Sequence, residues 1–303
     1  DPVVPLEVVY QGAHNAAIGA TWQTHHREFA AFLAEASPTC VTELGGADGF
    51  LAHTVLDAIP TVTWTIIDPN PTAPPHPRLE IHVGLFEPGS ELPDGTDVVV
   101  HSHFLEHVYE PRRLLESITE CVSPGTRTVF SVPSMLEQLG NGYANALNFE
   151  HTVFLRHEYV VWLLEVCGFE VLRTEFFRDH SVFVDARVTG RPGDAELPDF
   201  RTQNRGLLLA FTDGMREDAR ALAARADRFP GEVYVFGAHV FAQYLFAAGL
   251  PEERVMCLLD NNPAKQGKRL YGTGLEVAAP DCLAGVANAS VILRAAHYND
   301  EIR

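Results

Sequence analysis

Short apolar runs typical of buried strands alternate along this chain with longer stretches of helical period. Trp22, Phe29, Phe32 and Leu33 recur at helical spacing, which predicts an amphipathic helix near the start. The stretch 41–52, V-T-E-L-G-G-A-D-G-F-L-A, follows as a short apolar run, a glycine-rich turn and a return to apolar residues. This pattern predicts a strand that breaks into a tight turn and then a helix.

The same order of strand and helix recurs up to about residue 190. Apolar or β-branched runs predict strands within 61–68, 78–86, 96–102 and 126–133, and helical spacing follows most of them. A helix at 157–168 precedes two further runs, 170–177 and 180–188, which we expect to pair as an antiparallel hairpin. Alternating strands and helices predict an α/β, Rossmann-like fold with a mostly parallel sheet and ligands at the carboxyl ends of its strands.

The last third of the chain restarts this pattern. A polar, Pro-containing stretch at 191–199 reads as a linker, and an Ala- and Arg-rich helix is predicted from about Leu207 to Arg228. A strand, Gly237 and a helix follow, and a later strand ends on Asp260. We therefore expect a first domain at 1–190, a linker and helix at 191–230, and a second, smaller Rossmann-like domain at 231–303.

Composition narrows the classes of function. The formal net charge is −18 and no Lys/Arg cluster is present, which argues against a general nucleic-acid binder. The five cysteines are far apart and form no C-x-x-C pair, so we expect free thiols rather than a disulfide framework or a structural zinc site. With no membrane-spanning run or signal-peptide pattern, a cytoplasmic protein acting on a small molecule is expected.

The first constellation with chemical meaning is the glycine turn together with two acids. Gly45, Gly46 and Gly49 allow a ligand to approach the main chain, and Asp68 ends the next predicted strand, where a carboxylate can accept hydrogen bonds from ribose hydroxyls. Both dinucleotide enzymes and S-adenosylmethionine (SAM) enzymes use this arrangement. The dinucleotide template G-x-G-x-x-G is missed at its third glycine, so an NAD(P)-dependent oxidoreductase is the alternative rather than the main hypothesis.

The stretch E-L-G-G-A-D-G resembles the acidic-glycine motif of class I SAM-dependent methyltransferases, and three later landmarks occur in that family's order. I-I-D-P-N resembles its second-strand acid, H-F-L-E-H-V with E-P-R-R-L-L its fourth-strand segment, and V-S-P-G-T-R-T-V-F-S-V-P its fifth strand. The resemblance implies a SAM-dependent methyltransferase. The cofactor-binding residues that it implies are Glu43, Gly45, Gly46, Gly49, Asp68, Pro69, His103 and Phe104.

A narrower resemblance covers most of the chain. V-F-G-A-H-V-F-A-Q-Y-L, L-D-N-N-P-A-K-Q-G-K and Y-G-T-G-L-E-V are similar to phrases in the second domain of nucleotide-sugar C-methyltransferases. The W-x-x-H of Trp22 and His25 resembles that family's entry helix, while its N-terminal zinc-binding module has no counterpart in this sequence. This resemblance implies a nucleotide-linked sugar, or a related natural-product intermediate, as substrate.

In that family a Tyr-x-Glu-His stretch supplies the acid/base group, and here the matching positions are Asn148, Phe149, Glu150 and His151. The resemblance therefore implies that His151 is the general base and that Glu150 orients it or binds substrate hydroxyls. A histidine suits this role because its ordinary pKa of about 6.5 lies near working pH. The tyrosine is absent, so oxygen and nitrogen acceptors stand beside carbon.

The spacing H-x-H-x-x-x-H of His101, His103 and His107 offers possible zinc ligands, but it spans a strand end and a helix start where the SAM methionine should lie. We therefore expect no metal site. Substrate contacts are expected from His107, Glu106, Trp22, His25 and Asn148.

Three points stay open at this stage. Asp260 and Asn261 either repeat the strand-end acid of the first domain or cap a turn. Lys265 and Lys268 either meet a substrate phosphate or are solvated. A protein that binds SAM or a nucleotide without catalysis is the second alternative to a methyltransferase.

Overall fold

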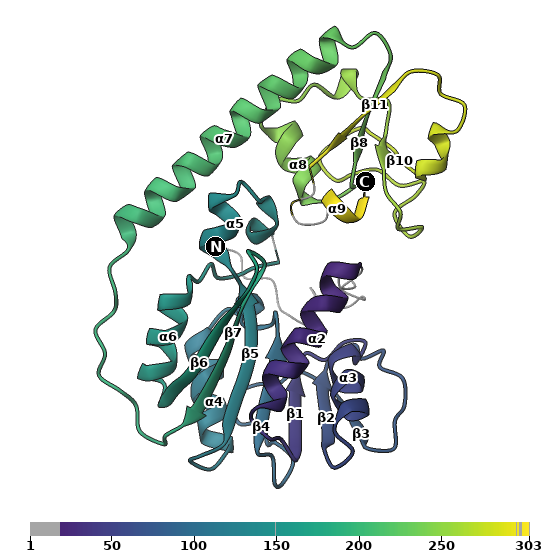
Figure 1. Cartoon of the computed structure of the whole chain (residues 1–303). Helices are drawn as coiled ribbons and strands as arrows, with labels where there is room; N and C mark the ends of the chain where they lie inside the picture. Colours follow the sequence, from purple (N-terminus) through teal and green to yellow (C-terminus); the bar gives the residue numbers. More distant parts are fainter. Residues whose placement is uncertain (1–18, 149, 295, 297–298, 303) are drawn as a thin grey trace. The chain divides into compact units, whose positions relative to one another are not determined.

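The computed structural model describes residues 19–148, 150–294, 296 and 299–302. They divide into two compact units (Figure 1). The first contains the described residues up to Met135 together with 150–199, and the second contains Leu136–Asn148 and the described residues from Phe200 onward. Each unit is considered by itself.

The first unit is built on a mixed sheet of seven strands in the order β3-β2-β1-β4-β5-β7-β6. The strands are β1 (Cys40–Leu44), β2 (Thr63–Asp68), β3 (Leu79–Val83), β4 (Val98–Ser102), β5 (Arg127–Pro133), β6 (Phe169–Phe177) and β7 (Ser181–Val188). The first five run parallel, while β7 pairs antiparallel with both β5 and β6. The predicted hairpin is thus present, and the carboxyl ends of β1, β2 and β4 lie at one edge.

Helices cover both faces of this sheet (Figure 1). They are α2 (Ala20–Ala34), α3 (Phe50–Ala58), the 3₁₀ turn η1 (Leu105–His107), α4 (Pro111–Cys121) and α6 (His157–Val166). One apolar cluster packs α2 and α3 against Val98 and Val100, and the other packs α4 and α6 against Val99. Successive residues of a strand point to opposite faces, which explains why consecutive valines of β4 enter different cores.

The second unit carries a parallel sheet of four strands in the order β10-β9-β8-β11. Its elements are α5 (Met135–Gly140), η2 (Ala144–Leu147), α7 (Arg201–Arg228), β8 (Glu232–Phe236), α8 (Val240–Ala247), η3 (Glu252–Arg254), β9 (Leu258–Leu259), β10 (Val277–Ala278), η4 (Pro280–Leu283), β11 (Ala289–Leu293) and α9 (Asn299–Ile302). Helix α7 begins at Arg201, earlier than the predicted Leu207, because its first turns are polar and lack the apolar period that marks a helix in the sequence.

The segment 136–148 joins the second unit through contacts to its helices and last strand. The Arg294 guanidinium, just beyond β11, pairs with Asp218 of α7 and donates to the Gly142 carbonyl at 3.2 Å. The Tyr244 hydroxyl of α8 donates to the Leu147 carbonyl at 3.3 Å. In the described part of the chain, no helix has the length and apolar character needed to span a membrane.

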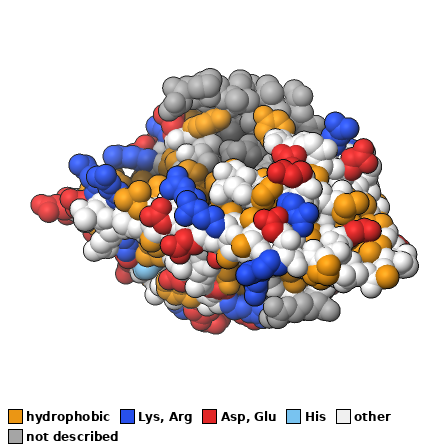
Figure 2. Space-filling view, turned by 90° about the horizontal axis from the view of Figure 1, so that it is seen from above, with side chains coloured by type: hydrophobic (Ala, Val, Ile, Leu, Met, Phe, Trp, Pro, Cys, Tyr) orange, Lys and Arg blue, Asp and Glu red, His pale blue; other side chains and the backbone are white. Residues whose placement is uncertain are grey.

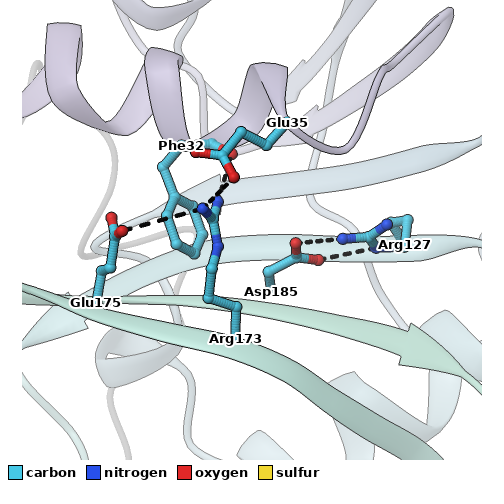
Figure 3. A network of polar contacts seen from close by, with 6 residues as sticks. All are labelled: Phe32, Glu35, Arg127, Arg173, Glu175 and Asp185. Atoms are coloured by element: carbon cyan, nitrogen blue, oxygen red, sulfur yellow. Dashed lines mark hydrogen bonds and ion pairs between the residues drawn. The ribbon is translucent and has the colours of Figure 1, made fainter.

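Polar contacts fix α2 on the sheet of the first unit (Figure 3). The Arg173 guanidinium of β6 pairs with Glu35, donates to the Phe32 carbonyl at 2.9 Å and lies 3.8 Å from the centroid of the Phe32 ring. Cations near a helix C-terminus are favoured by the helix dipole and by its unsatisfied carbonyls. Arg173 therefore holds the C-terminal end of the helix that carries Trp22 and His25.

Two acids of this sheet are almost fully buried, and each has one partner on a neighbouring strand. Asp185 of β7 is 2% exposed and forms a bidentate pair with Arg127 of β5. Glu43 of β1 is 3% exposed, and its Oε2 accepts a hydrogen bond from Trp64 Nε1 at 2.9 Å. Burial raises the pKa of Glu43 to about 8 against the opposing effect of the Trp64 hydrogen bond, so this carboxyl is largely neutral at pH 7.

Removing Asp185 should destabilise the first unit because Arg127 is left half-buried without its counter-charge. We expect Asp185→Ala to lower the free energy of unfolding by about 3 kcal/mol. The matched control is Glu170→Ala, which breaks the exposed Arg187–Glu170 pair of the same hairpin and should cost at most about 1 kcal/mol. Urea denaturation measures both, and equal losses in the two variants would contradict the assignment.

Glu43 should make stability depend on pH. In the unfolded chain this carboxyl ionises near its ordinary pKa of 4.5, whereas the folded one stays protonated up to about 8, so between these values folding must take up a proton. Relative to Glu43→Gln, the wild-type free energy of unfolding should fall by about 1.4 kcal/mol per pH unit across that window and run parallel to the variant outside it. Denaturation curves of the two proteins at a series of pH values check this. Parallel curves throughout would show that Glu43 is ionised in the fold.

Candidate functional site

The glycine turn between β1 and α3 is held by the end of β2. The Gly45 N–H donates to the Ile67 carbonyl at 2.9 Å. The two oxygens of Asp68 accept the N–H of Ala47 at 2.9 Å and the N–H of Asn70 at 2.7 Å. Gly45 and Gly49 have φ of 76° and 70°, a left-handed conformation that glycine adopts without the steric cost of a side chain.

Close packing around the turn requires glycine for a second reason. A Cβ on Gly45 would lie 2.6 Å from Cδ2 of Phe104, and one on Gly46 would lie 2.8 Å from the Ile66 side chain. Phe104, which follows β4, therefore rests directly on the turn that follows β1. The glycines make room for neighbouring side chains as well as for a ligand.

The acid that holds the turn, Asp68, has room to accept the ribose of SAM. Each Asp68 oxygen accepts one backbone hydrogen bond, and because a carboxylate has about four acceptor positions, positions remain for two ribose hydroxyls. Pro69, beside it, is half-buried. Glu43 lies elsewhere around the turn. Its buried carboxyl lies close to Gly46 and accepts a hydrogen bond from Trp64, so it packs against the turn within the protein. Its contact with the cofactor stays a prediction.

The loop after β4 brings His103 and Glu106 together. His103 has φ of 50°, in the left-handed region that non-glycine residues rarely adopt. Its Nδ1 lies 3.0 Å from Oε1 of Glu106, which is 4% exposed. Burial alone would raise the pKa of Glu106, but the hydrogen bond from His103 and the nearby charges of His103, His107 and His151 outweigh it and hold the pKa at about 2. Glu106 is therefore ionised.

The segment that carries His151 is hydrogen-bonded to this loop, although it lies far along the chain from it. The Glu106 carbonyl accepts the N–H of Thr152 at 2.8 Å, and His107 Nδ1 donates to the Glu150 carbonyl at 3.1 Å. These bonds place the His107 and His151 rings 4.9 Å apart, edge to face. A pocket opens beside them and is lined by Glu106, Val132, Pro133, Met135, His151, Val153 and Leu155. The predicted acid/base histidine and Glu106 thus share one cavity.

Trp22 and His25 of α2 lie against His103 rather than against His151. The Trp22 ring is 5.0 Å from that of His103, and the His25 ring is 5.3 Å from it. Asn148 belongs to the second unit, where its N–H donates to the Asn145 carbonyl at 3.2 Å. Asn148 is the residue at the position of the missing tyrosine, and Phe149, which follows it, lies outside the described residues.

Sequence reasoning did not find His180 and Ser181, which complete the surroundings of His103. Ser181 Oγ is 2.8 Å from His103 Nε2 and 2.5 Å from His180 Nδ1. His180 lies in the turn between β6 and β7 and Ser181 is the first residue of β7, far along the chain from His103. The only sequence signal was an adjacent His-Ser at a hairpin turn, and pairing β7 with β5 is needed to bring it to the site.

Comparison with known proteins identifies the family of the first unit. A family model described as a methyltransferase domain matches residues 20–174, just over half of the chain. Comparison with curated protein sequences gives no match.

Similar solved structures include three methyltransferases. A mitomycin 7-O-methyltransferase is 21% identical over 56% of this chain and 55% of its own, with a TM-score of 0.46. Human N-acetylserotonin methyltransferase in complex with SAM is 18% identical over 61% and 60%, with a TM-score of 0.43. An N,N-8-amino-8-demethyl-D-riboflavin dimethyltransferase from Streptomyces davawensis is 20% identical over 61% and 65%, with a TM-score of 0.41. The alignments thus span less than two thirds of each of these chains.

The family match and the strand order together confirm the predicted Rossmann-like class I fold and favour methyl transfer over the nicotinamide alternative. The chain belongs to the methyltransferase-domain family.

Proposed function

We propose that this protein transfers a methyl group from SAM to a small polar acceptor, with the reaction at the pocket beside His151. One observation carries the proposal. Phe104 rests on the glycine turn at Gly45, and two residues later the Glu106 carbonyl anchors the segment that carries His151. A single short loop thus links the turn suited to SAM with the pocket suited to the acceptor.

SAM, when bound, supplies an electrophilic methyl group on its sulfonium. Asp68 and the Gly45 turn hold the cofactor, so the protein's contribution is mainly alignment. His151 would take the proton that the acceptor atom loses when it is methylated. The ionised Glu106 lies close enough to stabilise the imidazolium that forms. Glu150, the predicted orienting group, is fixed through its carbonyl by His107.

For the substrate we propose a nucleotide-linked sugar or a related natural-product intermediate. The second unit supports this class because it repeats the acid-and-glycine turn of the first. The Gly237 N–H donates to the Leu259 carbonyl at 2.7 Å, and the oxygens of Asp260 accept the N–H of Ala238 and of Asn262, both at 2.9 Å. Lys265 Nζ is 3.1 Å from Asp260 and adds a positive charge that a phosphate would attract.

The acceptor atom is carbon, oxygen or nitrogen. Asn148 replaces the tyrosine of the nucleotide-sugar C-methyltransferases, and loss of that hydroxyl favours oxygen or nitrogen, whose protons His151 can remove without further activation. On the face seen in Figure 2, the described Lys and Arg side chains are interspersed with Asp and Glu and form no continuous basic surface. A small acceptor fits this surface better than a nucleic acid does.

Asp68 should determine SAM affinity. We expect Asp68→Asn to weaken SAM binding about 10- to 100-fold, because an amide cannot accept from both backbone N–H groups and both ribose hydroxyls as the carboxylate does. Asp260→Asn breaks the equivalent turn in the second unit and should leave SAM affinity unchanged. Isothermal titration calorimetry with SAM measures both, with circular dichroism to confirm folding. Equal losses in the two variants, or none in Asp68→Asn, would remove Asp68 from the cofactor site.

His151 should determine the rate of methyl transfer and not SAM binding. With the acceptor identified by mass spectrometry of molecules that co-purify with the protein, we expect His151→Ala to lower kcat by about 10²- to 10⁴-fold. His157→Ala is the matched control, since this half-exposed histidine of α6 contacts Glu158 and Phe176 outside the pocket. A His151→Ala variant with wild-type kcat would exclude His151 as the base. A wild-type protein that binds SAM yet methylates none of the co-purifying molecules would favour a non-catalytic binding protein.

A further inference from the structure

Three histidines from distant parts of the chain form a nearly equilateral triangle in the first unit. His25 lies on α2, His103 follows β4, and His180 precedes β7. Their ring centroids are 5.3 Å apart for His25–His103, 5.4 Å for His25–His180 and 5.5 Å for His103–His180. One nitrogen of each ring lies within 4.8 Å of the corresponding nitrogens of the other two.

This spacing is close to that of three imidazoles on one tetrahedral metal ion. A metal–nitrogen bond of about 2.0–2.1 Å places each ring centroid about 3.2 Å from the ion, and tetrahedral angles then separate the centroids by about 5.2 Å. The observed separations of 5.3–5.5 Å require only a small contraction to reach that value. The rings thus have the spacing of a three-histidine site, and their nitrogens, which lie within 4.8 Å of one another, would move closer together on binding the ion.

His25 is the observation that distinguishes this cluster from an ordinary hydrogen-bonded group. Its side chain is fully buried, with 0% exposure, and neither ring nitrogen has a hydrogen-bond partner in the described part of the chain. A buried polar group without a partner costs about 1–3 kcal/mol. The rings of Phe29, Phe177 and Phe183 lie 5.2–6.1 Å from the His25 ring, and those of His103 and His180 lie 5.3–5.4 Å from it.

The neighbours of His103 prepare it as a ligand. His103 Nδ1 lies 3.0 Å from Oε1 of Glu106, and a proton donated from Nδ1 to this oxygen leaves a lone pair on Nε2. A carboxylate that accepts from the second nitrogen of a histidine is the usual outer partner of a metal ligand. Ser181 Oγ lies 2.8 Å from His103 Nε2 and 2.5 Å from His180 Nδ1, so both nitrogens face this hydroxyl, which an ion bound between them would displace. Trp22 packs on all three imidazoles, at 4.7–5.2 Å, and shields them.

We propose that His25, His103 and His180 bind a divalent first-row transition metal ion such as Zn²⁺. The set consists of neutral nitrogen donors, which suits such ions and does not suit Mg²⁺ or Ca²⁺. Three protein ligands leave a fourth position for water. The ion would cross-link α2 to the loop after β4 and to the β6–β7 turn, next to the proposed acceptor pocket. The proposed site shares only His103 with the H-x-H-x-x-x-H pattern.

The test is direct metal binding by the whole chain, first stripped with a chelator. Titration with Co²⁺ should give one equivalent bound and visible d–d absorption of tetrahedral intensity, and one equivalent of Zn²⁺ should displace it. Zn²⁺ should also raise the Tm of the wild type. His25→Leu replaces the histidine with an apolar side chain of similar size, so the variant should fold. It should lose both the absorption and the Zn²⁺-dependent rise in Tm.

Two further variants separate this site from other histidines. His82→Ala removes a half-exposed histidine of β3 and should bind Co²⁺ as the wild type does. His151→Asn tests the neighbouring group of Glu106, His107 and His151, the other potential metal-ligand group in the described part of the chain, and should also keep the absorption. Absence of stoichiometric binding in the wild type, or full binding by His25→Leu, would overturn the proposal. Loss of binding in His151→Asn with retention in His25→Leu would assign the ion to the other group. None of these outcomes depends on methyltransferase activity.

Discussion

The geometry of the candidate site depends on the carboxylate of Asp68 and the two backbone N–H groups that it accepts. The Asp68 carboxylate connects the end of β2 to the turn that follows β1. Its hydrogen bonds fix the position of the glycine backbone in that turn. Phe104 packs against Gly45, and this contact positions the loop after β4. Through these hydrogen bonds and the packing of Phe104 on Gly45, one buried acid is linked to the ends of β1, β2 and β4.

The second unit uses the same device with one change. Asp260 also accepts two backbone N–H groups across a turn that contains a left-handed glycine, Gly237. It has in addition an ion pair with Lys265, whereas no described lysine or arginine forms an ion pair with Asp68. A carboxylate whose charge is already compensated is a poorer acceptor for hydroxyls, while the paired lysine keeps donors for an anion. The two turns therefore differ in charge, because only the second has a lysine paired with its acid.

Local patterns in the sequence predicted the elements of the fold and the strand-end residues, because apolar period, glycine and a terminal acid are local signals. The strands, the β6–β7 hairpin and the turn at Gly45 follow from such signals. Contacts between residues that lie on different strands could not be predicted from the sequence. Pairing of β7 with β5 brings His180 beside His103, and no short-range pattern encodes that pairing. The burial of Glu43 was missed for a similar reason, since its partner Trp64 is on another strand.

Two buried histidines without hydrogen-bond partners in the described part of the chain show why neighbours, and not burial alone, indicate a site. His101 of β4 is fully buried and stacks on Phe130 at 4.5 Å, and burial lowers its pKa to about 3 against the raising effect of Glu106. It therefore behaves as a neutral aromatic ring of the sheet. His25 is equally buried, and burial together with His103 and His180 lowers its pKa as well. Desolvation alone accounts for the lowered pKa of His101. At His25 two further imidazoles lie beside the ring, and packing of the core does not require imidazoles there.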